Sequence, residues 1–111
     1  MKVKDFARLA GLEIICMPDP EREIEGGYCG DLLSWVMGRA DSGSAWVTIM
    51  SNINIVAVAS LADAACVILA EGVTPDEGVK EKAEEQGVNI LCGSPNAFEL
   101  CAAIAALLKK E

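Results

Sequence analysis

The chain has 111 residues, of which 52% are hydrophobic, and 17 acidic against 9 basic side chains give a formal net charge of −8. This length predicts one domain, and the hydrophobic content excludes an intrinsically disordered protein. The negative charge opposes nucleic acid and anionic membranes, so we expect neither as a partner.

Apolar periodicity in the first third of the chain predicts a helix, a strand, an extended segment and a second helix over residues 3–9, 12–16, 24–29 and 32–39. Gly11 ends the first helix, and Pro18 and Pro20 require a turn after the strand. Asp31 is placed to cap the second helix.

The remainder of the chain alternates more regularly between strands and helices. Strands are expected over residues 45–49, 66–69 and 88–92, with helices over 53–61, from about 75 to 86, and 96–109. Thr74 before Pro75 and Ser94 before Pro95 are typical of a capping residue followed by a first helical proline. This order predicts an α/β fold: a single domain over residues 1–111 with a mainly parallel sheet flanked by helices.

Residues 53–70 are almost entirely apolar and have the length of a membrane span. Asp63 would lie inside such a span at a cost of several kcal/mol. A buried helix followed by a buried strand explains the stretch better. The first eight residues contain no apolar run of signal-peptide length, and we expect a cytoplasmic protein.

The five cysteines are an odd number and contain no Cys-x-x-Cys pair, and the sequence has no histidine. The spacing of a structural zinc site is therefore missing, and we predict neither a metal nor a cofactor. Most of the cysteines lie in apolar runs, which indicates reduced, buried thiols.

Three glycines, Gly26, Gly27 and Gly30, lie within five residues and directly precede Asp31. Such a cluster indicates a backbone with unusual dihedral angles or a close approach by another group. Ligands of open α/β sheets bind beyond the carboxyl ends of the strands, so this segment is a candidate site. The alternative for Asp31 is that it only caps its own helix.

A second polar segment follows the strand over residues 45–49. We expect residues 26–31, 48–54, 71–76 and 92–96 to meet at the carboxyl edge of the sheet. The hydroxyls and amides of residues 48–54 can bind a small ligand or can bond the turn backbone. The candidate ligand-binding residues are Gly26, Gly27, Asp31, Thr48, Asn52 and Asn54.

The common catalytic patterns are missing, because the sequence has neither a P-loop nor a histidine to activate a nucleophile. We therefore predict no catalytic residue. An alternative is an enzyme of thiol or transfer chemistry that uses Cys29 or Cys92, which precede predicted helix starts. Tyr28 and Trp35 are either core residues or the contact surface of an interaction adaptor, and Trp46 is expected in the core.

Several motifs resemble the DRTGG domain family in its stand-alone form. They are Glu21-Arg22-Glu23-Ile24-Glu25-Gly26-Gly27-Tyr28, Asp31-Leu32-Leu33-Ser34, Trp46-Val47-Thr48-Ile49, residues 54–61 and Ala97-Phe98-Glu99-Leu100. Glu21 and Glu25 stand where the family signature has Asp and Thr. A carboxylate in place of the Thr hydroxyl beside the glycines disfavours phosphate binding at that point.

The resemblance implies a regulatory or dimerising module. DRTGG domains occur alone and beside CBS domains in nucleotide-regulated pyrophosphatases, and they are similar to the amino-terminal domain of HPr kinase/phosphorylase. We therefore expect a non-enzymatic homodimer that senses a small, nucleotide-like ligand or a partner protein.

Overall fold

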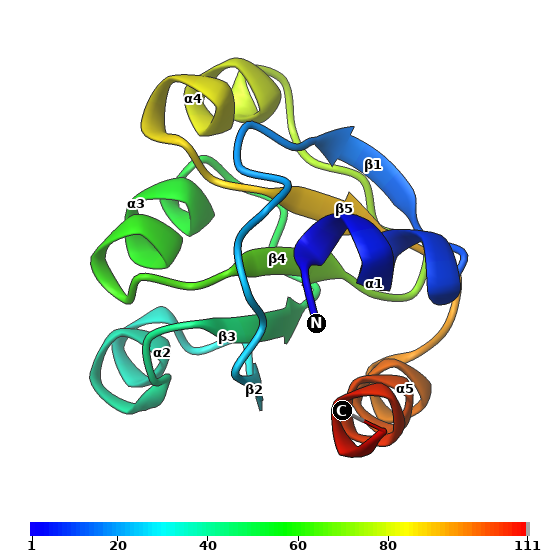
Figure 1. The fold of residues 1–111 in the computed structure, drawn as a ribbon. Coiled ribbons are helices and arrows are strands. Elements are labelled where there is room, and N and C mark those ends of the chain that lie inside the picture. The colour runs from blue at the N-terminus through cyan, green and yellow to red at the C-terminus, as the bar shows by residue number, and fades with distance from the viewer. Residues whose placement is uncertain (111) are drawn as a thin grey trace.

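A five-stranded sheet lies at the centre of the computed structural model, which describes residues 1–110 (Figure 1). In chain order the elements are α1 (Val3–Leu9), β1 (Glu13–Cys16), β2 (Gly26–Cys29), α2 (Leu33–Arg39), β3 (Ser44–Thr48), α3 (Asn54–Leu61), β4 (Cys66–Leu69), α4 (Val79–Gln86), β5 (Ile90–Cys92) and α5 (Ala97–Lys109). The predicted α/β class and mainly parallel sheet are confirmed.

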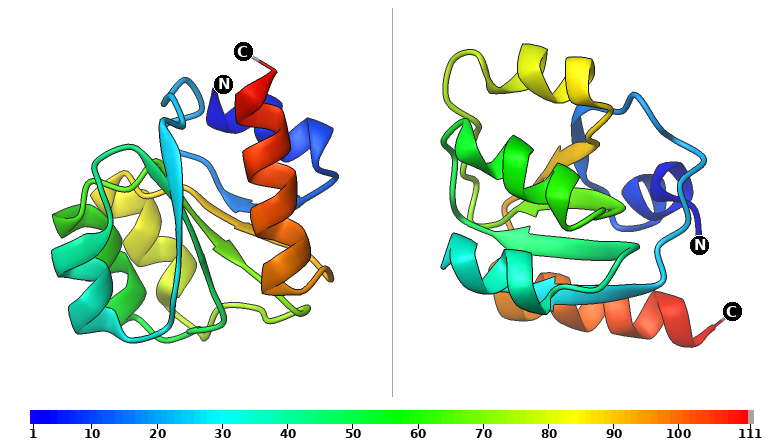
Figure 2. Two further views of the ribbon diagram at one scale, coloured as in Figure 1. Left: turned by 90° about the horizontal axis from the view of Figure 1, so that it is seen from below. Right: turned by 90° about the vertical axis from the view of Figure 1, so that its left-hand side faces the viewer.

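The strand order is β1-β5-β4-β3-β2, with β2 to β5 parallel and β1 antiparallel to β5. Each crossover from β2 to β5 moves one strand along the sheet in the same direction. Crossovers of one hand then place α2, α3 and α4 on the same face. Helices α1 and α5 cover the other face, which gives three layers (Figure 2).

The central strands are buried on both faces, and successive side chains enter two separate cores. Ala45 and Val47 of β3 lie in the core beneath α1 and α5, whereas Trp46 lies in the core beneath α2, α3 and α4. Trp46 is completely buried, as predicted. Residues 53–70 form α3 and β4, also as predicted, and none of the helices within residues 1–110 has both the length and the hydropathy of a membrane span.

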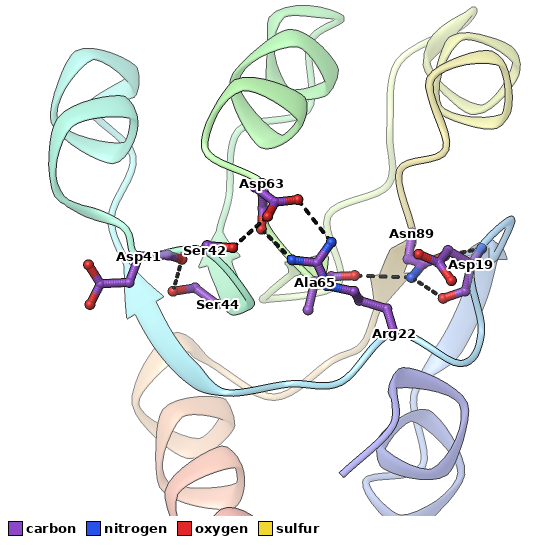
Figure 3. Close-up of polar contacts among 8 residues, drawn as sticks. All are labelled: Asp19, Arg22, Asp41, Ser42, Ser44, Asp63, Ala65 and Asn89. Carbon is purple, nitrogen blue, oxygen red and sulfur yellow. Dashed lines mark hydrogen bonds and ion pairs between the residues drawn. The ribbon is translucent and has the colours of Figure 1, made fainter.

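Residues 17–25 connect the two edge strands by running along the amino ends of the parallel strands (Figure 3). Because β1 is antiparallel to the other strands, it ends at the same end of the sheet at which β2 begins, and the connection does not have to run back along the length of the strands. Buried Asn89 donates to the carbonyls of Asp19 (2.7 Å) and Ala65 (3.0 Å) and accepts from the Asp19 amide (2.9 Å). The Arg22 guanidinium donates to the carboxylate and the carbonyl of Asp63, at 2.9 and 3.0 Å.

The three predicted caps were wrong. Helix α2 begins after Leu32, and Asp31 bonds Thr48 and Ile49 instead. Thr74 lies in a loop, because Asp76 bonds Ser51 through both its amide and its carboxylate and α4 begins only after Gly78. The cap of α5 is Asn96, which forms a capping box with Glu99, and not Ser94.

Candidate functional site

The loops that follow the four parallel strands meet at the carboxyl edge of the sheet, as predicted. The Ile49 amide donates to Asp31 (3.0 Å) and the Asp76 amide donates to the Ser51 carbonyl (2.9 Å). The amides of Glu71 and Gly72 donate to the carbonyls of Pro95 and Gly93, at 2.8 and 2.9 Å. Each loop is therefore bonded to its neighbour, and the edge forms one continuous surface.

Two of the predicted site residues, Asp31 and Thr48, are in direct contact. The buried Thr48 hydroxyl donates to Asp31 Oδ1 at 2.7 Å and accepts from the Met50 amide at 3.2 Å. Both protein bonds to the exposed Asp31 carboxylate use Oδ1. The other oxygen, Oδ2, takes part in neither bond and is available as an acceptor for a ligand.

The turn between β2 and α2 is fixed by Trp46, a role that the sequence did not indicate. The Trp46 indole N–H donates to the Gly30 carbonyl at 2.8 Å, and the Gly30 amide donates to the Val47 carbonyl at 3.1 Å. Gly30 is thus held from both sides. The buried β3 strand sets the position of the turn, and with it the position of Asp31.

A hollow of about 460 Å³ lies beside this turn, lined by Tyr28, Cys29, Gly30, Asp31, Leu32, Trp35 and Arg39, and we call it the turn pocket. The Arg39 guanidinium lies 3.6 Å from the centroid of the Trp35 ring. Trp35 is 51% exposed, in agreement with its interpretation as a surface residue. Arg39 was missed, although its spacing of four residues from Trp35 places both on one face of a helix.

The other predicted site residues lie elsewhere. Gly26 and Gly27 are within β2, opposite Ser44 and Ala45, and not in a turn. Asn52 accepts from the Asn54 amide at 2.9 Å, the backbone bond named as the alternative to ligand binding. Asn54 lines a separate hollow between α3 and α4.

The three glycines do not relieve backbone strain. Neither Gly26, Gly27 nor Gly30 has a positive φ, so the expectation of unusual dihedral angles was wrong. Close approach is found at Gly30, where a Cβ would lie 3.2 Å from Tyr28 Cε2, whereas at Gly27 a Cβ would make an ordinary van der Waals contact of 3.5 Å with Ile104 Cγ2 of α5. A mostly apolar groove of about 390 Å³ runs between β2 and α5, lined by Gly27, Tyr28, Cys29, Val47, Cys101, Ile104, Ala105 and Leu108, and we call it the α5 groove.

The thiol alternative receives no support at Cys92. This side chain is buried and donates to Glu13 Oε2 at 3.1 Å. Burial, with the neighbouring Glu13 carboxylate, raises the pKa of the Cys92 thiol to about 11, so the nucleophilic thiolate is disfavoured. Within residues 1–110, His, Cys, Asp and Glu side chains form no group of three or more that could hold a metal ion.

The fold has a solved neighbour among known proteins. The chain is similar to the CBS and DRTGG domains of the regulatory region of Clostridium perfringens pyrophosphatase, solved with its activator diadenosine tetraphosphate. The TM-score is 0.71 at 12% sequence identity, and the match covers 93% of this chain. It covers 45% of that chain, so this protein spans less than half of its solved neighbour. No curated protein matches the sequence.

The family is identified by a second comparison. The model of the DRTGG domain matches residues 31–107, from Asp31 of the turn pocket into the last turn of α5. The motif over residues 21–28 lies before the matched range, on the amino edge and in β2. Because the match covers more than half of the sequence, the chain belongs to the DRTGG domain family.

Proposed function

We propose that residues 1–111 form one non-catalytic regulatory module of the cytoplasm, which binds a small, nucleotide-like ligand in the turn pocket and acts as a homodimer. One observation carries the ligand half of this proposal. The turn pocket is lined by an exposed indole ring, a guanidinium and a carboxylate that a hydrogen bond holds in place.

These three groups match three parts of a nucleotide. A base can stack on the face of the Trp35 ring over which the Arg39 guanidinium lies at 3.6 Å, once Arg39 moves off the ring. Arg39 can then donate to a phosphate. Asp31 Oδ2 can accept from a ribose hydroxyl, and its negative charge directs the phosphate toward the Arg39 side of the pocket.

The family supports the regulatory part of the proposal. The solved neighbour is a regulatory region in complex with a dinucleotide activator. Its likeness to this chain concerns the fold, and the turn pocket supplies the separate argument for the ligand class. The remaining predicted residues, Gly26, Gly27, Asn52 and Asn54, lie outside the turn pocket and are not part of the proposed site.

The ligand half is tested by titrating adenosine, AMP, ATP and diadenosine tetraphosphate in a calorimeter and by thermal unfolding. A nucleotide present at 100 times its Kd should stabilise the protein by about 2.7 kcal/mol. Trp35→Ala should weaken binding at least tenfold, whereas Phe98→Ala, another exposed aromatic residue outside the pocket, should leave it unchanged. Failure of all four compounds to bind at millimolar concentration would refute this half.

The phosphate assignment has its own test. Arg39→Gln keeps most of the side-chain length but removes the charge, so it should weaken AMP and ATP binding while adenosine binds as before. An equal loss for all three compounds would show that Arg39 does not contact the phosphate.

The dimer half depends on exposed apolar side chains beside the pocket. Leu32 is 56% exposed and Ile49 47% exposed, and the Ile49 amide is bonded to the residue that precedes Leu32. A second copy would remove this surface from water. Sedimentation at tens of micromolar should show a dimer that Leu32→Asp dissociates, whereas Leu61→Asp, at a more exposed leucine of α3, should not. A wild-type monomer would contradict the proposal.

A partner protein is the second candidate, favoured by the exposure of Trp35 beside half-buried Tyr28. It predicts a wild-type monomer that binds no nucleotide and captures a specific protein. Trp35→Ala should then abolish that capture.

A further inference from the structure

The packing of α5 on β2 brings two cysteines together. Gly27 faces Ile104, and Cys29 lies two residues further along the strand, on the same face of the sheet. Cys101 precedes Ile104 by three residues and lies on the same face of α5. Strand and helix run in opposite directions, so steps of about 6.6 Å along β2 and about 4.5 Å along α5 place Cys29 opposite Cys101.

The environment of the two thiols agrees with this placement. Cys29 and Cys101 both line the α5 groove, where Cys29 is exposed and Cys101 is half-buried. Burial raises the pKa of the Cys101 thiol, and the neighbouring Cys29 thiol raises it further. The small residue at position 27 suits this contact, because a side chain longer than alanine would meet Ile104 of α5.

The other three cysteines are in different surroundings. Cys16 is buried and donates to the Val88 carbonyl at 3.4 Å. Cys66 is buried in the core, which raises the pKa of its thiol to about 12, and Cys92 is buried beside Glu13. The pair in the α5 groove is therefore the one that an oxidant can reach.

We propose that Cys29 and Cys101 are a modification site, at which a hydroperoxide converts the two thiols into a disulfide within one chain. The Cys29 thiolate attacks hydrogen peroxide, so that an S–O bond forms and the O–O bond breaks, and the hydroxide that leaves takes up the proton lost by the Cys29 thiol and becomes water. The Cys101 sulfur then attacks the Cys29 sulfenic acid, the S–O bond breaks, and water leaves with the Cys101 proton. In total, two thiols are oxidised and one hydrogen peroxide is reduced to two waters.

The disulfide would act on both hollows beside β2. It would tie α5 covalently to the edge strand across the α5 groove. Because Cys29 also lines the turn pocket, the oxidised form would differ there too. The disulfide needs only the two thiols and the peroxide, so this proposal does not rest on the proposed function.

The test is peroxide treatment of the full chain under non-denaturing conditions, followed by denaturation and thiol counting. The number of free thiols should fall from five to three, and the mass should decrease by about 2 Da, the two hydrogen atoms lost. A reducing dithiol should restore both values. Trypsin followed by cleavage after Glu99 places Cys29, Cys92 and Cys101 on separate peptides, so the map identifies the pair.

Two variants give the matched controls. Cys29→Ser and Cys101→Ser should each abolish the intrachain disulfide, and Cys101→Ser should leave a Cys29 sulfenic acid that a dimedone-type reagent labels. The wild-type peptide map decides the question even where a variant fails to fold. Five free thiols after treatment, a link from Cys29 to Cys92, a disulfide between two chains, or a sulfinic acid at Cys29 with no disulfide would each overturn the proposal.

Discussion

The polar residues at the two ends of the parallel strands have different roles. We call these ends the amino edge and the carboxyl edge. At the amino edge, Asn89 bonds the backbone of Asp19 and Ala65, and Arg22 bonds the carboxylate and the carbonyl of Asp63 (Figure 3). These bonds hold the segment that connects β1 to β2. At the carboxyl edge, the exposed Asp31 carboxylate keeps one oxygen outside its protein bonds, and Trp35 and Leu32 stay exposed beside a hollow.

This difference separates folding from binding. A polar side chain whose hydrogen-bonding groups are all bonded to the protein's own backbone contributes to stability and has few donors or acceptors left for a ligand. Arg22 belongs to the family motif over residues 21–28, yet it bonds Asp63 at the amino edge and does not line the turn pocket. The amino edge should therefore respond to mutation in stability, and the carboxyl edge in binding.

The largest contrast is expected between two asparagines. Asn89→Ala should cost about 3 kcal/mol in the free energy of unfolding, because it leaves the buried Ala65 carbonyl and the half-buried Asp19 amide and carbonyl without their Asn89 partner. Asn52→Ala at the carboxyl edge removes one bond to the Asn54 amide and should cost about 1 kcal/mol or less. Urea unfolding of both variants measures the difference. Equal losses would mean that the two edges contribute alike to stability.

A smaller effect is expected within β2, the strand that joins the two edges. Gly27→Leu should destabilise the protein by about 1–3 kcal/mol more than Gly26→Leu, because Ile104 of α5 occupies the space at Gly27. No atom lies within 4 Å of a Cβ at Gly26, and neither glycine has a positive φ, so backbone strain does not enter the comparison. Thermal unfolding of the two variants measures this difference in stability, and equal stabilities would contradict the packing role of Gly27.

The smallest expected effect is the pH dependence of the amino edge. Hydrogen bonds from Arg22 and Ser42 lower the pKa of Asp63 to about 2 from its ordinary value of 3.8. The pKa of Asp63 is lower in the folded state than in the unfolded state. The contribution of the ionised Asp63 to the free energy of unfolding is therefore complete above about pH 4 and is lost as the pH falls toward 2. Asp63 is 58% exposed, so solvent screening limits the contribution to about 0.5–1 kcal/mol.

Asp63→Asn isolates this contribution. Asparagine tolerates the left-handed backbone at this position (φ 55°) and has no carboxyl group to titrate. The stability difference between wild type and variant should shrink between pH 4 and pH 2 in acid unfolding experiments. Glu21, whose pKa is lowered to about 2 by Lys2 and Lys4, titrates in both proteins and cancels in the difference. A constant difference would show that the Arg22–Asp63 pair does not contribute through charge.

Local sequence patterns predicted the elements and not the contacts between them. The bounds of α1 and β4 agree with the periodicity, because alternation and helical spacing report burial directly. The caps failed at Asp31 and Thr74 because each of these segments found partners distant in sequence, in Thr48 and Ser51. A capping residue competes with every donor that the fold brings near, and the sequence does not reveal those donors.

The sequence by itself determined the α/β class, the four loops that meet at one edge and the resemblance to the DRTGG family, because these follow from hydrophobic periodicity, strand order and short motifs. The tertiary structure alone decided the antiparallel direction of β1, the bond between Thr48 and Asp31, and the turn pocket around Trp35 and Arg39. It also decided that Cys29 lies beside Cys101. The direction of β1 and the Thr48–Asp31 bond depend on pairing between segments remote in sequence. The turn pocket and the cysteine pair depend on how α2 and α5 pack on the sheet, through contacts such as that between Gly27 and Ile104.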